Sequence, residues 1–129
     1  MGLAEKKVIK SLEEEVIPAL RSRINAAIGK DIEISINWDS FETEAQLREV
    51  QHQCLDRIAE GLEKIAKDDM GKEALNESLN TLVVNNITDA SAKKIELSDG
   101  TLTVDGKWED FGSGIFRPVE YSRQIEGSL

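Results

Sequence analysis

His52 is the single histidine of the sequence, which makes it the obvious candidate for acid–base chemistry near neutral pH. Arg48 and Asp56 lie four residues before and after it, so all three would share one polar face of a helix. Cys54, the single cysteine, lies two residues away and would point in another direction, which disfavours a Cys–His nucleophile. The commoner interpretation is a helix histidine with an ionic neighbour. We predict that His52 is exposed and remote from any deep pocket, and we assign no catalytic residue.

Acidic turns are the next candidates, because a hard cation prefers several oxygen ligands. Asp99 and Asp105 each precede a glycine, and such steps are typical of tight turns, while the spaced ligands of a calcium loop are missing. One histidine and one cysteine also exclude the common zinc sets. The triplet Asp110-Phe111-Gly112 matches the magnesium-binding triplet of protein kinases, but the chain is too short for that fold. The sequence therefore predicts neither a metal nor a cofactor.

An aromatic segment near the C-terminus allows two interpretations. Trp108, Phe111, Phe116 and Tyr121 fall within fourteen residues, with glycines between them. Such a cluster is typical of an adaptable contact surface, and on that hypothesis Trp108, Phe111 and Phe116 are candidate binding residues. The commoner alternative is a lid that closes the sheet over the helices, because large aromatic side chains usually fill cores.

Charge supplies the second candidate surface. The net charge of −9 argues against binding to nucleic acid, which needs a basic surface. Residues 31–70 carry four basic and eleven acidic side chains, so the acid is densest there. On the helix expected in this region, the candidate residues for docking on a basic partner protein are Glu44, Glu49, Glu60 and Glu63. The alternative is that the acid only solvates the surface.

Two long helices and an intervening strand are expected in the first half of the chain. Apolar residues recur at steps of three and four from Val8 to Ile28, with a kink expected at Pro18 and a C-cap at Gly29. A second such stripe predicts a helix over residues 41–67, with Asp39 and Glu42 as its capping box. Between them Ile32–Trp38 alternates between apolar and polar residues, which predicts a strand with one buried face in the same sheet as the later strands.

Strands dominate the prediction for the rest of the chain. We expect a strand within 79–87, a hairpin around Ser98-Asp99-Gly100 and a β-leaning stretch over 115–125 that holds Pro118. Short turns favour antiparallel pairing. The predicted fold is α+β: one domain over residues 1–129, with two long helices on one face of a mostly antiparallel sheet of four to five strands. Since we find neither a secretory signal nor an apolar run of membrane length, we expect a cytoplasmic protein without membrane contact.

Three functions fit these features. The preferred hypothesis is a non-enzymatic protein-binding domain, similar to an inhibitor or immunity protein, that docks on a basic partner. The second is a small enzyme or ligand-binding protein with a pocket between sheet and helices. The third is a structural homodimer, formed because the apolar stripes of the two helices exceed what one sheet covers.

Overall fold

The first long helix has three parts. The computed structural model describes residues 2–129, and it begins with α1 (Leu3–Ser11), the π-helical turn η1 (Leu12–Val16) and α2 (Ile17–Ile28). Pro18 has no amide hydrogen to donate to the preceding turn, and next to it the Ile17 N–H bonds to the Leu12 carbonyl, five residues back. The expected kink at Pro18 therefore takes the form of a wider turn. Gly29 ends the helix in the left-handed region at φ 74°, as predicted.

The second long helix repeats this plan. A 3₁₀ turn, η2 (Trp38–Ser40), leads to α3 (Glu44–Val50), the π-helical turn η3 (Gln51–Leu55) and α4 (Asp56–Ile65). The predicted capping box is wrong by four residues, because Thr43 caps the helix and Gln46 returns the bond. A further helix, α5 (Asp69–Ser78), follows, and the Asp68 carboxylate accepts from the Gly71 N–H at its start.

The sheet has four strands, β1 (Glu33–Ile36), β2 (Thr81–Asn86), β3 (Lys94–Ser98) and β4 (Thr101–Gly106), in the order β1-β2-β4-β3. β1 pairs with β2 and β2 with β4 in parallel, and only β3 and β4 are antiparallel. The predicted α+β class is confirmed, but the mostly antiparallel arrangement is wrong. The helix between β1 and β2 allows a parallel crossover. The hairpin around Asp99 then places β4, not β3, beside β2.

The C-terminal stretch is a helix, so the predicted strand over 115–125 is wrong. After the 3₁₀ turn η4 (Ala90–Ala92) and the hairpin, a loop leads to α6 (Pro118–Glu126). Pro118 occupies the first helical turn, where its missing N–H costs nothing. The buried residues Tyr121, Ser122 and Ile125 follow a helical spacing.

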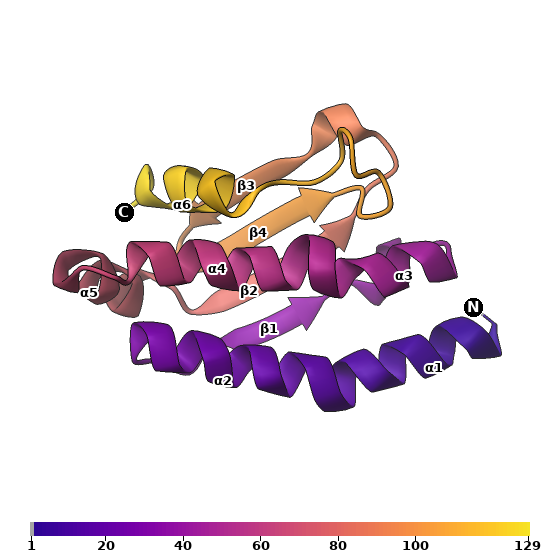
Figure 1. Ribbon diagram of the computed structural model, residues 1–129, viewed down its shortest axis with the longest axis horizontal. Coiled ribbons are helices and arrows are strands. Elements are labelled where there is room, and N and C mark those ends of the chain that lie inside the picture. Colours follow the sequence, from indigo (N-terminus) through magenta and orange to yellow (C-terminus); the bar gives the residue numbers. More distant parts are fainter. Residues whose placement is uncertain (1) are drawn as a thin grey trace.

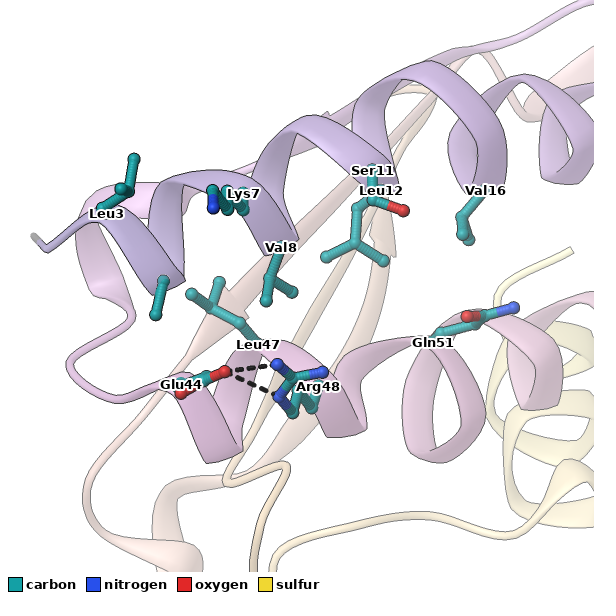
Figure 2. A pocket seen from close by; sticks show the side chains of 11 residues that line it. Leu3, Lys7, Val8, Ser11, Leu12, Val16, Glu44, Leu47, Arg48 and Gln51 are labelled. Atoms are coloured by element: carbon teal, nitrogen blue, oxygen red, sulfur yellow. Dashed lines mark hydrogen bonds and ion pairs between the residues drawn. The ribbon is translucent and has the colours of Figure 1, made fainter.

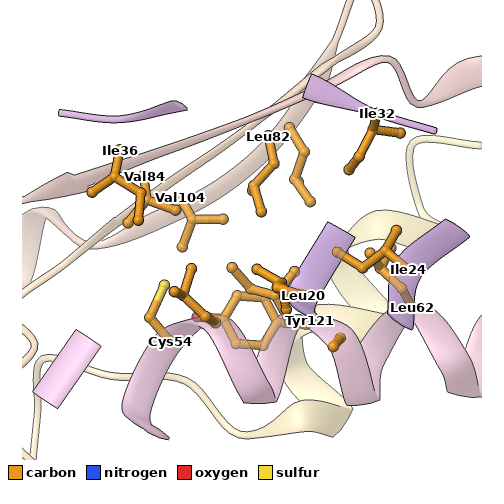
Figure 3. Packing of buried hydrophobic residues seen from close by; sticks show 14 of the residues in the cluster. Leu20, Ile24, Ile32, Ile36, Cys54, Leu62, Leu82, Val84, Val104 and Tyr121 are labelled. Carbon is orange, nitrogen blue, oxygen red and sulfur yellow. The ribbon is translucent and has the colours of Figure 1, made fainter. Parts of the chain in front are cut away.

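The helices lie together over one face of the sheet (Figure 1). Along β2 and β4 the buried residues alternate with half-buried ones, and the buried set faces the helices. Ile36 lies on the same side, which confirms that the predicted strand belongs to this sheet. Figure 3 shows the space between the layers filled by packed side chains such as Leu20, Leu62 and Leu82. Within the described residues, no helix is long and apolar enough to cross a membrane.

Candidate functional site

The aromatic candidates separate into core and surface. Trp108 and Tyr121 are fully buried and Phe116 is 8% exposed, whereas Phe111 is 56% exposed. The Trp108 ring lies on Gly106, where an added Cβ would be 2.4 Å from ring atoms. Phe116 and Tyr121 meet edge to face with ring centroids 5.5 Å apart. This placement favours the lid interpretation for the segment and leaves Phe111 as its exposed member.

The acidic candidates on α3 and α4 also separate. Glu44 is paired with Arg48 one turn along its own helix, and Glu63 accepts two hydrogen bonds from Arg23 of α2, at 2.9 and 2.7 Å. The hydrogen bond from Arg23 holds the pKa of Glu63 below its usual value, and the same bond raises the pKa of Arg23. Glu49 and Glu60 make no ion pair with any of residues 2–129. Two of the four carboxylates are therefore already neutralised within the molecule.

His52 and Cys54 lie where the sequence places them. The His52 side chain is 69% exposed, its Nδ1 lies 3.3 Å from Oδ2 of Asp56, and it lines neither of the two hollows described below. Cys54 is buried, and burial raises the pKa of its thiol well above the ordinary value, so the thiol stays protonated. Among residues 2–129 no three His, Cys, Asp or Glu side chains gather as metal ligands would.

A groove of about 630 Å³ lies between the N-terminal parts of the two long helices. Figure 2 shows Val8 and Leu12 projecting from one helix towards Leu47 of the other, with these apolar side chains at the base of the groove. Lys7 of α1 and Arg48 of α3 lie along its sides. We name this hollow the helical groove.

Local structure explains why the helical groove stays open. Figure 1 shows α1 continuing past the end of the sheet, and none of its residues, Leu3–Ser11, is buried. α1 packs on α3 instead of on a strand. The two π-helical turns face each other at the inner end of the groove, where Val16 and Gln51 line a common crevice. Such turns occur frequently at functional sites.

A second hollow, of about 390 Å³, lies under the loop between β4 and α6. Phe111 and Phe116 line it, so two of the aromatic candidates lie together there. Glu44 lines the helical groove, and the other acidic candidates line neither hollow. We name the second hollow the loop pocket.

The prediction that the apolar residues of the helical groove belong to the core is confirmed for Leu12 and Leu47, which are 5% and 0% exposed, whereas Val8 is only half-buried. Val8 and Leu12 belong to the stripe of the first helix, and Leu47 to that of the second. One feature of the sequence could have indicated that the start of this helix is partly exposed. The first apolar stripe starts ten residues before Pro18, which is longer than a helix needs to be to cover a strand of four residues such as β1. The basic side chains of the loop pocket are spread over more than sixty residues of sequence and leave no local pattern.

Comparison with known proteins finds no matching family model, no matching curated protein and no matching solved structure.

Proposed function

We propose that this protein is a non-enzymatic binding module whose helical groove accepts an amphipathic helix of a partner protein. The groove between α1 and α3 carries the proposal, because it combines an apolar base with a helix, α1, that packs on α3 and buries none of residues 3–11. A pocket between sheet and helices, which a small enzyme would need, has less support, since packed side chains fill that space.

A helix suits the shape of the helical groove. α1 and α3 run side by side, and a third helix can complete the packing by inserting its ridges between them. Its anchor residues would recur at steps of three and four and contact Val8 and Val16, which are half-buried, because Leu12 and Leu47 are already covered within the protein. Leu3, which is 69% exposed at the outer end, would be covered at the same time.

The charge around the helical groove indicates acidic residues on the partner helix. α1 carries Lys6, Lys7 and Lys10 against one acidic residue, Glu5, on a protein whose net charge is −9. Arg48 lies on the opposite side of the groove. On that side Glu44 pairs with Arg48, so the net positive charge lies along α1, and glutamates on the edge of the partner helix that faces α1 would favour the correct orientation and faster association.

Fluorescence anisotropy with labelled synthetic peptides tests the proposal. One peptide of about four turns carries leucines at steps of three and four with glutamates beside them, and its twin carries lysines there. We expect saturable binding of the glutamate peptide, and binding at least about tenfold weaker with the lysine twin. Val8→Asp should abolish binding, whereas Ser22→Asp, at an exposed position of α2, should leave it unchanged.

Three results would overturn the helical groove as a binding site. The first is that neither peptide shows saturable binding. The second is that the lysine twin binds as tightly as the glutamate peptide. The third is that Val8→Asp and Ser22→Asp lower the affinity equally. Sedimentation equilibrium of the protein alone supplies a further control. A dimer that Val8→Asp dissociates would mean that a second copy of the chain occupies the groove.

Docking on a basic partner is the second candidate function. It is supported by Glu49 and Glu60, whose carboxylates have no ion-pair partner among residues 2–129. Glu44 and Glu63 add less to such a surface because each is paired with an arginine. Reversing the charge of Glu49 and Glu60 tests this candidate.

A further inference from the structure

The loop pocket gathers positive charge on an acidic protein. Arg57 of α4, Lys93 after η4 and Arg117 before α6 all line it, together with one carboxylate, that of Glu120. Three cations against one anion give this hollow the opposite sign to the molecule as a whole, whose net charge is −9. Clefts lined by one sign of charge concentrate ligands of the other sign.

Two of these cations lack an acidic partner. Arg57 donates from Nη1 to the carbonyl oxygen of Phe116 at 3.1 Å, and Lys93 donates from Nζ to that of Ile115 at 2.9 Å. The Lys93 ammonium also lies 4.7 Å from the centroid of the Phe116 ring. No carboxylate among residues 2–129 lies within 4.0 Å of either group. Both therefore retain charge and donor capacity towards the pocket, and their backbone bonds fix where they lie.

The loop pocket is also lined by a residue, Gln53, whose side-chain oxygen has no hydrogen-bond donor among residues 2–129. The side-chain oxygen of Gln53 is buried, and within the described residues no donor reaches it. A buried acceptor without a donor is costly, so a ligand that brings an N–H or O–H group there gains the full value of that bond. Phe111, 56% exposed, offers an aromatic surface at the same hollow.

The charge state of Glu120 decides which cations can bind an anion. Its Oε1 accepts from the Arg117 backbone N–H at 3.0 Å and from Arg117 Nε at 3.2 Å. The backbone bond in particular lowers the pKa of Glu120, so the carboxylate is ionised at neutral pH. The ionised Glu120 offsets Arg117, which leaves the two cations unpaired within residues 2–129, Arg57 and Lys93, for a ligand, and a carboxylate can present one oxygen to each.

We propose that the loop pocket binds a carboxylate that carries a neighbouring N–H donor and an apolar side chain, the chemistry of an N-acylated amino acid or of a peptide C-terminus. The carboxylate would lie between Arg57, Lys93 and Arg117, where the ammonium of Lys93 and the guanidinium groups of the two arginines can donate to it. The donor would reach the side-chain oxygen of Gln53, and the apolar group would pack on Phe111. This site is separate from the helical groove and does not depend on the function proposed for it.

Titration of the isotope-labelled protein by NMR tests this assignment, with N-acetyl-leucine as the probe and N-acetyl-leucinamide as its uncharged match. We expect saturable shifts around residues 111–120 with N-acetyl-leucine, and at least about tenfold weaker binding of the amide, because the charge-assisted bonds are lost. Acetate and inorganic phosphate lack the donor or the apolar group, and we expect them to bind less tightly as well.

Variants of the pocket separate binding from folding. Lys93→Gln and Arg117→Gln should each weaken N-acetyl-leucine about tenfold, while Lys64→Gln, at an exposed position of α4, should not. Because Lys93 also holds the loop, Gln53→Leu provides a second test. It removes a buried acceptor that has no donor, so thermal stability should be kept or raised while binding of N-acetyl-leucine falls.

Peptides that end in leucine distinguish the two sources of this chemistry. A peptide with a free C-terminus that binds at least about tenfold more tightly than N-acetyl-leucine identifies a peptide C-terminus, and equal affinity identifies the small molecule. The proposal is overturned if N-acetyl-leucine gives no saturable shift, if its amide, acetate or phosphate binds as tightly, or if Lys64→Gln weakens binding as much as Lys93→Gln.

Discussion

The two long helices pack differently at their two ends. At one end α2 and α4 lie on the sheet and bury apolar residues such as Leu20, Ile24, Ile58 and Leu62. At the other end α1 packs on α3 beyond the sheet and buries none of its own residues. An ion pair between Arg23 and Glu63 joins the two helices at the sheet, whereas the Glu44–Arg48 pair stays within α3. The same helical spacing of apolar residues therefore continues the core into α3, where Leu47 and Val50 are buried, but leaves the residues of α1 partly exposed.

A π-helical turn separates the two ends in each helix. Leu12–Val16 and Gln51–Leu55 both close hydrogen bonds over five residues, which adds one residue to the turn. The extra residue widens the turn and shifts the side chains that follow relative to a regular α-helix. In the first helix the apolar steps of four continue through this turn, from Val8 and Leu12 to Leu20 and Ile24.

Removing core volume should give the largest difference between the two ends. Leu62→Ala, in the fully buried part of α4, should lower the free energy of unfolding by about 3 kcal/mol. Val8→Ala in α1 should cost less than about 1 kcal/mol, because its side chain is only half-buried. Urea denaturation followed by circular dichroism measures both values. Equal losses would mean that α1 belongs to the same cooperative core.

Crowding the contact between α4 and α6 should have the next largest effect. A Cβ at Gly61 would lie 2.7 Å from the Cβ of Tyr121 and 3.1 Å from the Pro118 carbonyl oxygen, so Gly61→Ala must push α6 away. We expect a loss of about 2 kcal/mol, net of the better helix propensity of alanine. Gly112→Ala is the matched control, because its nearest neighbour would be 3.8 Å away. If both variants keep full stability by urea denaturation, the close packing of α6 on α4 is wrong.

The ion pair at the sheet end should give a small, pH-dependent contribution. Bonding to Arg23 lowers the pKa of Glu63 in the folded protein, so this stability is present above the unfolded pKa of about 4.3 and is lost as the pH falls through the lower folded value. Glu63→Gln should therefore cost about 0.5 kcal/mol at pH 7, with the difference from the parent disappearing at acidic pH. Glu60→Gln, which breaks no ion pair, should show no such convergence in the same urea titrations at several pH values.

Residues with strong local signals were predictable from sequence. Gly29 ends the first helix as expected, and the turn at Asp99 and Gly100, with φ of 52° and 81°, forms the expected hairpin. These positions need a backbone conformation that few residues tolerate, so the residue type carries the information. The periodicity of both long helices is a local property of the same kind.

The features that could not be predicted from the sequence depend on residues that are far apart in the chain. Nothing in β4 indicates that it pairs with β2, and the choice between parallel and antiparallel neighbours is decided by the whole sheet. The error at Pro118 was avoidable, because proline at the start of a helix followed by Glu120 is a common cap. For the candidate sites, periodicity identified Val8 and Leu47 but could not show that Leu47 is fully buried while α1 buries none of its residues. Arg57, Lys93 and Arg117 meet only through the fold.

Charge reversal at the glutamates of α3 and α4 should have the smallest effect on stability. It also tests whether these glutamates bind a partner. Glu49 lies in α3, at the end of the helical pair that extends beyond the sheet (the overhanging end), and Glu60 lies in α4, at the end that packs on the sheet. Glu49→Lys and Glu60→Lys should each change the free energy of unfolding by less than about 0.5 kcal/mol. If the protein docks on a basic partner, their combined field speeds the encounter, so both reversals should slow association and reduce its salt dependence, because the Debye length is about 8 Å at physiological ionic strength. Stopped-flow association rates with a partner isolated from the native source, measured at two salt concentrations, provide the test. Should only Glu49→Lys slow association, the contact lies at the overhanging end beside the helical groove. Should neither reversal nor salt change the rate, the acid serves to solvate the surface and docking on a basic partner is wrong.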